Sequence, residues 1–313
     1  MKNDGLYGRL YGGNKPRKLE MILADAAAKG AQVILTGGAL GTNHGLATAI
    51  YGVQMGFRVV VLLTYEHPGP STGRNLCWMR AAGAVLHYVG SIPQAFLMAP
   101  YYMQRYRDGA SGRYPYPLWP GASTPLGTVG YVNAALELAE QIAEGQMPEP
   151  AAIFVPLGSA GTAAGLLLGL RLAGLRSRLI AVAVTRAPTA WASSVARLAN
   201  STARLLECRG APSLPCVKAS EVEVTRRWLG KGFGRPSEEG ARAQVMLAET
   251  EGLLLEPVYT AKTMAATIDM VGSGGVAGSA LYWHTYNAVA EPPPYTPEEW
   301  MKLPPSLRRF CVQ

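Results

Sequence analysis

The chain has 313 residues, of which 49% are hydrophobic and 16% are charged, and its formal net charge is +8. Disordered chains combine low hydrophobicity with high net charge, so this composition excludes a largely disordered protein and allows one large or two smaller domains. The charge would suit anionic ligands, acidic partners or nucleic acid. Lysine and arginine are scattered without a long basic run, so we expect an ordinary basic surface and no nucleic-acid partner.

The cysteines, histidines and apolar stretches disfavour several other classes of protein. The four cysteines and four histidines are far apart and include no Cys-x-x-Cys spacing, so neither a zinc site nor a disulfide scaffold is expected. The polar opening "MKNDGLYG" lacks the apolar region of a signal peptide. The charge-poor stretch 151–170 contains Pro156 and "GSAGT", which disfavour a membrane span. We therefore expect a cytoplasmic protein with no membrane partner.

The first part of the chain alternates between helical periodicity and short apolar runs. Leu19, Ile22, Leu23 and Ala26 recur at helical spacing. This alternation is typical of a parallel sheet with helices on both faces. Helices are predicted over 17–29, 43–55 and 72–82, and strands over 32–36, 58–64 and 84–89.

A stretch rich in Gly, Pro, Ser and aromatic residues, 108–126, predicts a long loop and a crossing between domains. The alternation then resumes. The proline-rich residues 291–310 are expected to pack on the surface as an extended tail. Helices are predicted over 127–144, 161–174, 190–206, 238–251 and 260–271, and strands over 151–156, 178–184 and 280–284.

A Gly- and Ser-rich turn separates a strand from a helix in "VPLGSAGTAAGLLLG", residues 155–169. Backbone N–H groups in such a turn, with a helix N-terminus behind them, suit a phosphate. The Gly-Lys-Ser/Thr of a nucleotide P-loop is absent, and the glycine spacing does not match a dinucleotide fingerprint. We interpret the turn as a phosphate site without a nucleotide, with glycines that serve only close packing as the alternative.

A second strand–turn–helix junction, "TGGALGTNHGLATA", places Thr42 at a helix N-cap with Asn43 and His44 behind it. Backbone N–H groups and a hydroxyl at such a position can hold a carboxylate. Capping alone also explains Thr42, and a single histidine such as His44 is more often structural than catalytic.

The segment "GGNKPRKLE" places a lysine directly at a helix start. Gly12 and Gly13 permit a tight turn, Asn14 tolerates its dihedral angles, and Pro16 fits the first helical position. Lys15 then lies at the positive end of the helix dipole, where its ammonium form is disfavoured. A neutral amine, a phosphate site and a carboxylate site together fit pyridoxal phosphate and an amino-acid substrate.

The blocks "GGNKPRKLE", "TGGALGTNH", "GSAGTAAG" and "EPVYTAKTM" occur in the order found in one enzyme family. Over nearly the whole chain the sequence resembles the fold type II pyridoxal-phosphate enzymes of the 1-aminocyclopropane-1-carboxylate (ACC) deaminase and D-cysteine desulfhydrase group. The resemblance implies a tryptophan synthase β-like α/β fold with two three-layer domains and parallel-rich sheets. It also implies a smaller domain over 18–122, a larger cofactor-binding domain over 1–17 plus 123–313, and a homodimer.

The resemblance also implies roles for single residues. Lys15 would form the Schiff base with pyridoxal phosphate and move the Cα proton, Lys18 would be structural, and Tyr259 would be the second catalytic group. Asn43 would bond the phenolic oxygen of the cofactor. The remaining cofactor contacts would be Gly158, Ser159, Ala160, Gly161, Thr162, Thr260 and Thr285. The substrate contacts would be Thr42, Asn43, His44, Phe233 and Tyr286.

Several positions depart from the family pattern. Thr260 stands where the deaminases have a glutamate for the pyridine nitrogen, which favours elimination of a good leaving group over ring opening. Phe233 replaces a tyrosine on the substrate side. In "HTYN", Tyr286 and Asn287 replace glycines and would add bulk near the cofactor, and Thr285 is a second candidate for the ring nitrogen. Relatives have a further segment before "KNDG", so the start is either misassigned or trimmed.

These observations lead to one main functional hypothesis and two alternatives. The main hypothesis is a pyridoxal-phosphate-dependent lyase or deaminase of a small amino acid, with D-cysteine desulfhydrase-like β-elimination to a 2-keto acid and ammonia. The first alternative is ACC deaminase-like ring-opening deamination. The second is a protein that carries the cofactor without turnover.

Overall fold

The computed structural model describes residues 1–214, 216–289 and 296–311. Its chain divides into two compact units. Unit 1 comprises Met1–Lys18 and Ser123–Val289, and unit 2 comprises Leu19–Ala122 with the described C-terminal residues 296–311.

Unit 1 is built on a parallel sheet with the strand order β1-β9-β6-β7-β8. The central strand β6 is buried along its whole length, as expected for a parallel sheet that is covered on both faces. In the register, Phe154 of β6 lies opposite Ile180 of β7 and Tyr282 of β9. The strands are β1 (Lys2–Asn3), β6 (Ala152–Leu157), β7 (Arg178–Ala183), β8 (Glu223–Thr225) and β9 (Ala280–His284).

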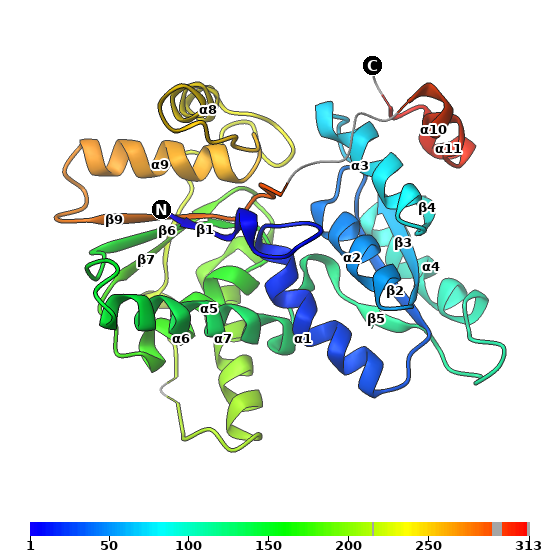
Figure 1. Ribbon diagram of the computed structural model, residues 1–313, viewed down its shortest axis with the longest axis horizontal. Coiled ribbons are helices and arrows are strands. Elements are labelled where there is room, and N and C mark those ends of the chain that lie inside the picture. Colours follow the sequence, from blue (N-terminus) through cyan, green and yellow to red (C-terminus); the bar gives the residue numbers. More distant parts are fainter. Residues whose placement is uncertain (215, 290–295, 312–313) are drawn as a thin grey trace. The chain divides into compact units, whose positions relative to one another are not determined.

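Helices cover both faces of this sheet, so that unit 1 has three layers (Figure 1). Because side chains alternate along a strand, Ile153 and Val155 face one layer of helices, and Phe154 faces the other. The first layer contains α5 (Pro125–Ala143), α6 (Gly161–Leu172) and α7 (Ala192–Glu207). The second contains α8 (Glu238–Glu251) and α9 (Thr260–Gly272).

Unit 2 is built on a second parallel sheet, with the order β4-β3-β2-β5. Val60 and Leu62 of β3 pack with Tyr102 of α4, whereas Val59 and Val61 on the opposite face contact α2. The strands are β2 (Val33–Ala39), β3 (Arg58–Thr64), β4 (Val85–Gly90) and β5 (Tyr116–Leu118). The helices are α1 (Asn14–Ala28), which begins in unit 1, α2 (Asn43–Gln54), α3 (Pro70–Ala81) and α4 (Ile92–Arg105).

The predicted helices and strands are confirmed, but α4, β1, β5 and β8 were not predicted. Helix α4 begins with a Ser91/Gln94 capping box, which is a helix signal in the sequence. Pro100 lies inside the helix, and Phe96 and Leu97 are exposed, so its apolar side chains do not form a single stripe. Strand β5 lies within the stretch that we predicted as a loop.

The expectation of an extended C-terminal tail in the larger domain is wrong for the described residues 296–311. They form α10 (Pro297–Met301) and α11 (Pro305–Arg308) and belong to unit 2. Leu303 and Leu307 are 1% and 0% exposed, and the thiols of Cys311 and Cys77 of α3 share a hydrogen bond. Residues 291–295 of the expected tail lie outside the described residues.

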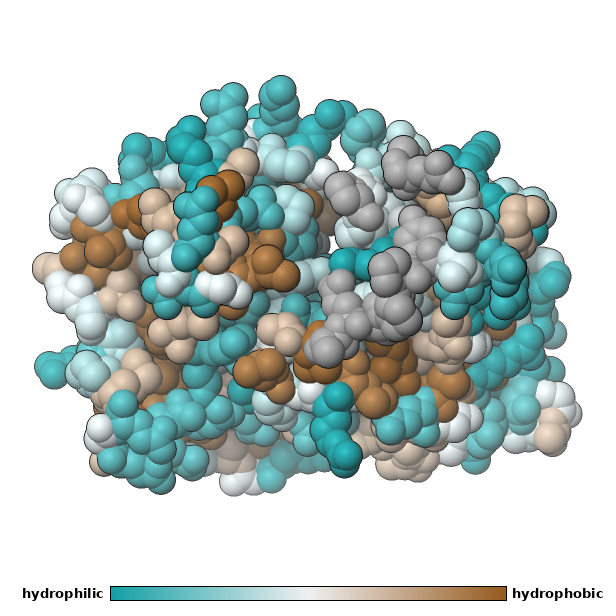
Figure 2. All heavy atoms as spheres, turned by 45° about the horizontal axis from the view of Figure 1, so that its top comes forward, coloured by the Kyte–Doolittle hydropathy of each residue, from teal (hydrophilic) through white to brown (hydrophobic). Residues whose placement is uncertain are grey.

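Short 3-10 helices complete the described elements: η1 (Asp4–Leu6), η2 (Pro120–Ala122), η3 (Pro188–Ala190) and η4 (Ala219–Glu221). Among the described residues, the helices are too short or too polar to cross a membrane. Figure 2 shows hydrophilic residues around the face in view, with hydrophobic residues gathered in patches between them.

Candidate active site

The candidate site in unit 1 lies where β6 and β9 end. In parallel sheets, ligands bind beside the carboxyl ends of the strands. The backbone N–H of Asn14, in the first turn of α1, donates to Thr285 O just beyond β9 at 3.1 Å. The Asn14 side chain donates to Thr162 Oγ1 of α6 at 3.2 Å. These two bonds place the start of α1, and with it Lys15, at the carboxyl edge of the sheet.

The two glycines before Lys15 are required by close backbone contacts. Gly13 has φ +89°, and a Cβ on it would lie 2.7 Å from Thr285 O. A Cβ on Gly12 would overlap Gly5 O at 1.7 Å. Helix α1 begins at Asn14, earlier than predicted, so Pro16 is not its first residue. Pro16 still lies in the first turn, whose N–H groups have no intrahelical acceptor.

The buried residue Asp4 forms hydrogen bonds with the residues on either side of Lys15. Asp4 is 1% exposed, and its Oδ1 accepts from Arg17 Nε and Nη2, each at 2.9 Å. Its Oδ2 accepts from Tyr131 OH at 2.6 Å and Trp283 Nε1 at 2.7 Å. Asp4 O accepts the Gly13 N–H at 2.8 Å. Asp4 was not predicted from the sequence, because its partners Tyr131 and Trp283 are far away in the chain.

Two lysine amines lie together at the start of α1. Burial lowers the pKa of the Lys15 amine from the usual 10.5 to about 8. Lys18, which is 1% exposed, also has a lowered pKa, because of burial and then because of the charge on Lys15. A bound anion would offset both effects. The proximity of the two amines follows from their spacing, since residues three apart share a helix face.

The turn between β6 and α6, residues 158–162, has the properties of an anion site; we call it the glycine turn. Ala160 precedes α6 with φ +67° and, within the described residues, provides no side-chain cap. A Cβ on Gly161 would lie 2.9 Å from Lys18 Nζ and 2.7 Å from Ser123 Oγ. Ser123 Oγ is 2.8 Å from Ser159 Oγ. Helix N–H groups, hydroxyls and a lysine therefore converge on the glycine turn.

Lys18, for which the resemblance implies a structural role, lies beside the glycine turn. Its amine reaches the glycine turn, where a Cβ on Gly161 would contact it. Ser123 was also not predicted, because it lies within the predicted loop 108–126 and carries no motif of its own. Only its hydrogen bond to Ser159 identifies Ser123 as a residue of the candidate site.

Tyr259 and Phe233 lie beside the glycine turn. A Cβ on Gly158 would be 3.1 Å from Tyr259 Cε1. The rings of Phe233 and Tyr259 meet edge to face, with centroids 5.8 Å apart, and Phe233 is 41% exposed. Tyr259, the predicted second catalytic group, and Phe233, a predicted substrate contact, are thus neighbours in unit 1.

The hydroxyl of Thr260, the first residue of α9, is bonded to the backbone of Glu256. Thr260 Oγ1 donates to Glu256 O at 3.1 Å and accepts from Glu256 N at 2.6 Å. Since its one hydrogen is used, Thr260 can act toward a ring nitrogen only as an acceptor. Thr285, the second candidate for that role, is buried next to the start of α1.

We expected the side chain of Asn287 to add bulk near the cofactor. In the structure it forms hydrogen bonds with backbone groups. Asn287 Oδ1 accepts from Gly12 N–H at 2.6 Å and from Val289 N–H at 3.2 Å. Its Nδ2 donates to Val289 O at 3.2 Å. Tyr286 is half-buried in the same segment, and its predicted contact with substrate stays a prediction.

In unit 2, the predicted N-cap is confirmed. Thr42 Oγ1 accepts from Gly45 N–H at 3.1 Å at the start of α2. His44 is 4% exposed, and its Nε2 lies 3.0 Å from Thr36 Oγ1. Thr36 gives its own hydrogen to Leu118 O, so Nε2 of His44 must donate. These contacts favour the structural interpretation of His44.

Asn75 of α3 fixes the orientation of the Asn43 side chain. Asn75 is 0% exposed, and its Nδ2 donates to Gly41 O at 2.8 Å and to Asn43 Oδ1 at 3.1 Å. Because the oxygen of the Asn43 amide faces Asn75, its NH₂ group is turned the other way. Asn75 was not among the residues predicted from the sequence.

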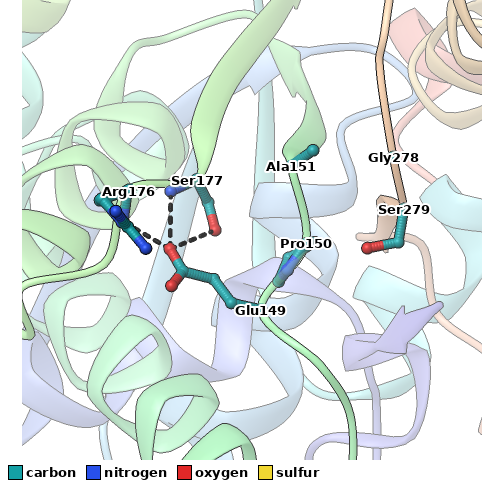
Figure 3. Close-up of a pocket in the computed structure, with 7 residues that line it drawn as sticks. All are labelled: Glu149, Pro150, Ala151, Arg176, Ser177, Gly278 and Ser279. Atoms are coloured by element: carbon teal, nitrogen blue, oxygen red, sulfur yellow. Dashed lines mark hydrogen bonds between the residues drawn. The ribbon is translucent and has the colours of Figure 1, made fainter.

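A cavity of about 430 Å³ in unit 1 is not a candidate active site (Figure 3). Its lining residues precede β6, β7 and β9, so it lies at the amino ends of the parallel strands, opposite the edge where ligands bind. Glu149 in this cavity accepts from Arg176 N–H, Ser177 N–H and Ser177 Oγ (Figure 3). Its carboxylate is satisfied by the local backbone.

The chain is similar to several solved structures. The chain is similar to a protein described as an ACC deaminase homologue, with 30% identity, a TM-score of 0.77, and coverage of 91% of this chain and 83% of that chain. It shares its fold with O-ureido-L-serine synthase, at 17% identity, a TM-score of 0.61, and coverage of 93% of this chain and 82% of that one. A mutant of that synthase with O-ureido-L-serine bound matches with a TM-score of 0.60, 17% identity, and coverage of 93% and 81%.

The family model "Pyridoxal-phosphate dependent enzyme" matches residues 1–285. The predicted fold class, with parallel sheets and helices on both faces, is confirmed, and so is the predicted cofactor, pyridoxal phosphate. The chain belongs to the family of pyridoxal-phosphate-dependent enzymes with the type II fold.

Proposed function

We propose that this enzyme is a lyase or deaminase of a small amino acid, and that it carries out D-cysteine desulfhydrase-like β-elimination to a 2-keto acid and ammonia. The observation that carries this proposal is the pair of neighbouring amines at the start of α1, half-buried Lys15 and buried Lys18. Lys15 has a pKa lowered to about 8, and Lys18 Nζ reaches the glycine turn. The similarity to an ACC deaminase homologue supports the same class of chemistry.

The residues of the glycine turn fit a phosphate group. The N-terminus of α6 is uncapped by side chains within the described residues, and a Cβ on Gly161 would occupy the space in front of Lys18 Nζ. We assign Lys18, Ser159, Thr162 and the neighbouring N–H groups to the cofactor phosphate. Its dianion would offset the cost of burying two amines. When bound, pyridoxal phosphate withdraws electrons from the substrate Cα.

The side chains of this enzyme would then bind the substrate and move protons. Lys15 would hold the cofactor covalently and act as the base for the Cα proton, because its amine is partly neutral near pH 8. Tyr259 would hold or deliver a proton beside the glycine turn. We assign the substrate carboxylate to Thr42 and the N–H groups at the start of α2, and the phenolic oxygen of the cofactor to the NH₂ group of Asn43.

The residue at the pyridine nitrogen favours elimination over ring opening. Neither Thr260 nor Thr285 carries a negative charge, so the ring nitrogen would be less protonated than beside a carboxylate. A weaker electron sink suits a substrate with a good leaving group at Cβ. Assembly as a homodimer and a cytoplasmic location remain predictions.

The absorbance spectrum of the purified protein is expected to test this function directly. With pyridoxal phosphate added, we expect a visible band that shifts with D-cysteine, and pyruvate and ammonia should form in parallel. A panel of D- and L-amino acids and ACC, assayed for keto acids, would define the substrate. Release of keto acid from ACC but not from D-cysteine would favour ring-opening deamination. A bound cofactor without keto acid from any amino acid would contradict the proposal and favour a non-catalytic protein.

Asn75→Asp is expected to weaken cofactor binding about tenfold, the effect of losing one hydrogen bond of ordinary strength. A carboxylate in place of the Asn75 NH₂ group would repel Asn43 Oδ1. The Asn43 amide would then rotate and withdraw its donor from the cofactor. The affinity is measured by titrating the apoprotein with pyridoxal phosphate.

Asn75→Ala is the control for this prediction, because it removes the same hydrogen bonds without forcing the Asn43 amide to rotate. We expect its affinity to lie between those of the wild type and Asn75→Asp. Thermal unfolding of the three apoproteins would show whether stability changes in the same order. Equal cofactor affinity in all three proteins would contradict the assigned role of Asn43.

A further inference from the structure

Lys262 of α9 is a buried cation to which the proposed chemistry assigns no role. It is 0% exposed, and its Nζ donates to Leu229 O and Gly232 O, each at 2.9 Å. A buried ammonium is tolerated only where protein acceptors replace its water. Both carbonyls belong to one loop, residues 229–234, so the function of the buried charge is tied to that loop.

The 229–234 loop has little backbone structure to hold it in place. Gly230, Gly232 and Gly234 have φ values of +62°, +117° and +73°, and such glycines give a chain many alternative conformations. Within the described residues, the loop's own backbone bond from Gly232 N–H to Leu229 O is long, at 3.4 Å. The two charge-assisted bonds from Lys262 are shorter and stronger. Lys262 therefore fixes the position of the loop.

The loop carries the aromatic side chain that faces the site. Phe233 meets the ring of Tyr259 edge to face, with centroids 5.8 Å apart. Tyr259 in turn contacts the glycine turn at Gly158. Tyr259 lies at the N-cap of α9, and Lys262 follows it within the first turn. The first turn of α9 thus positions Tyr259 directly and the 229–234 loop through Lys262.

We propose that Lys262 is a positioning residue that sets the substrate range of this enzyme by holding the 229–234 loop. Phe233 then forms an apolar wall against Tyr259, and this wall admits amino acids with small or apolar β-substituents and disfavours charged ones. The inference rests on the proposed function, because it requires an amino acid to react beside Tyr259.

The test compares wild type, Lys262→Met and the control Lys231→Met. Methionine keeps the length of the side chain but removes the donors to the loop carbonyls. Lys231 is an exposed lysine of the same loop, so its replacement removes a charge without removing the bonds to Leu229 O and Gly232 O. The first readout is amide hydrogen exchange of the apoproteins over residues 229–234. We expect exchange about tenfold faster, or more, in Lys262→Met and unchanged exchange in Lys231→Met.

The second readout separates positioning from a general loss of structure. In Lys262→Met we expect an unchanged cofactor spectrum and a kcat within about threefold of wild type, with KM for the best substrate raised about tenfold or more. Phe233→Ala, a substitution at a half-exposed side chain, should raise KM similarly. The double variant Lys262→Met/Phe233→Ala should be no worse than either single variant, since both act on one wall.

The possible outcomes distinguish this inference from the proposed function. Unchanged exchange of the loop, or an unchanged KM, in Lys262→Met would overturn the inference. A fall in kcat with loss of the cofactor spectrum would also overturn it, because it would indicate a structural role. If the wild type converts no amino acid, the proposed function fails. The exchange data would then still decide whether Lys262 holds the loop.

Discussion

Lys15→Ala is expected to abolish covalent attachment of pyridoxal phosphate and to lower turnover by about 10²–10⁴-fold, the range typical of a lost catalytic base. The fold should survive, because replacement removes a buried amine whose charge is disfavoured. Attachment is measured by borohydride reduction of the loaded protein followed by peptide mapping. Circular dichroism checks the fold.

Lys18→Met is the matched control, since Lys18 is a second buried amine on the same helix turn. It should retain the adduct on Lys15 but bind the cofactor more weakly, as expected for a lost phosphate contact. A reduced adduct on Lys18 in the wild type would contradict both assignments. In addition, only the neutral amine attacks the cofactor aldehyde, so the rate of attachment to the apoprotein should rise with pH and level off above about pH 8.

Asp4→Asn is expected to lower the free energy of unfolding by about 3–5 kcal/mol, the usual effect of breaking a buried ion pair from one side. The Arg17 guanidinium would keep only its ion pair with the partly exposed Glu137. An amide cannot accept from Arg17, Tyr131 and Trp283 as the carboxylate does. Because Asp4 also supports the turn of Lys15, cofactor affinity should fall as well. Urea unfolding and a cofactor titration measure the two effects.

Lys2→Met provides the comparison from the same segment. Lys2 pairs with Glu137, and their side chains are 11% and 39% exposed. An ion pair with one partner open to solvent contributes about 0–1 kcal/mol. If Asp4→Asn and Lys2→Met had equally small effects on unfolding, the contacts of Asp4 would not be what holds the start of α1.

Local signals in the sequence were sufficient to predict most of the helices and strands. Strand β3 has the predicted bounds, Arg58–Thr64, and α8 the predicted bounds, Glu238–Glu251, because a β-branched run and helical periodicity lie within single short segments. Strand β1 has only the residues Lys2–Asn3, too few for a periodic signal. Helix α4 was missed because proline and exposed apolar side chains obscure its pattern.

In the candidate site, too, some residues could be predicted from local sequence signals and others could not. Lys15 and the glycine turn lie in contiguous motifs, so the sequence was sufficient to single them out. Asp4, Ser123, Asn75 and Lys262 act through partners that only the fold brings near, such as Trp283, which is 279 positions from Asp4. No window of sequence contains both members of such a pair. Their importance could be found only from contacts.

The pairing of β1 with β9 also has a consequence for how this enzyme is made. Residues Lys2 and Asn3 lie opposite Trp283 and His284, so β1 can pair only after Trp283 and His284 have been synthesised. Contacts between such distant residues slow folding. Until β9 arrives, the edge of β6 that it covers is unpaired and open to association with other chains. The turn of Lys15, tied to Thr285, is therefore assembled late, and the cofactor can be captured only after synthesis has passed that residue.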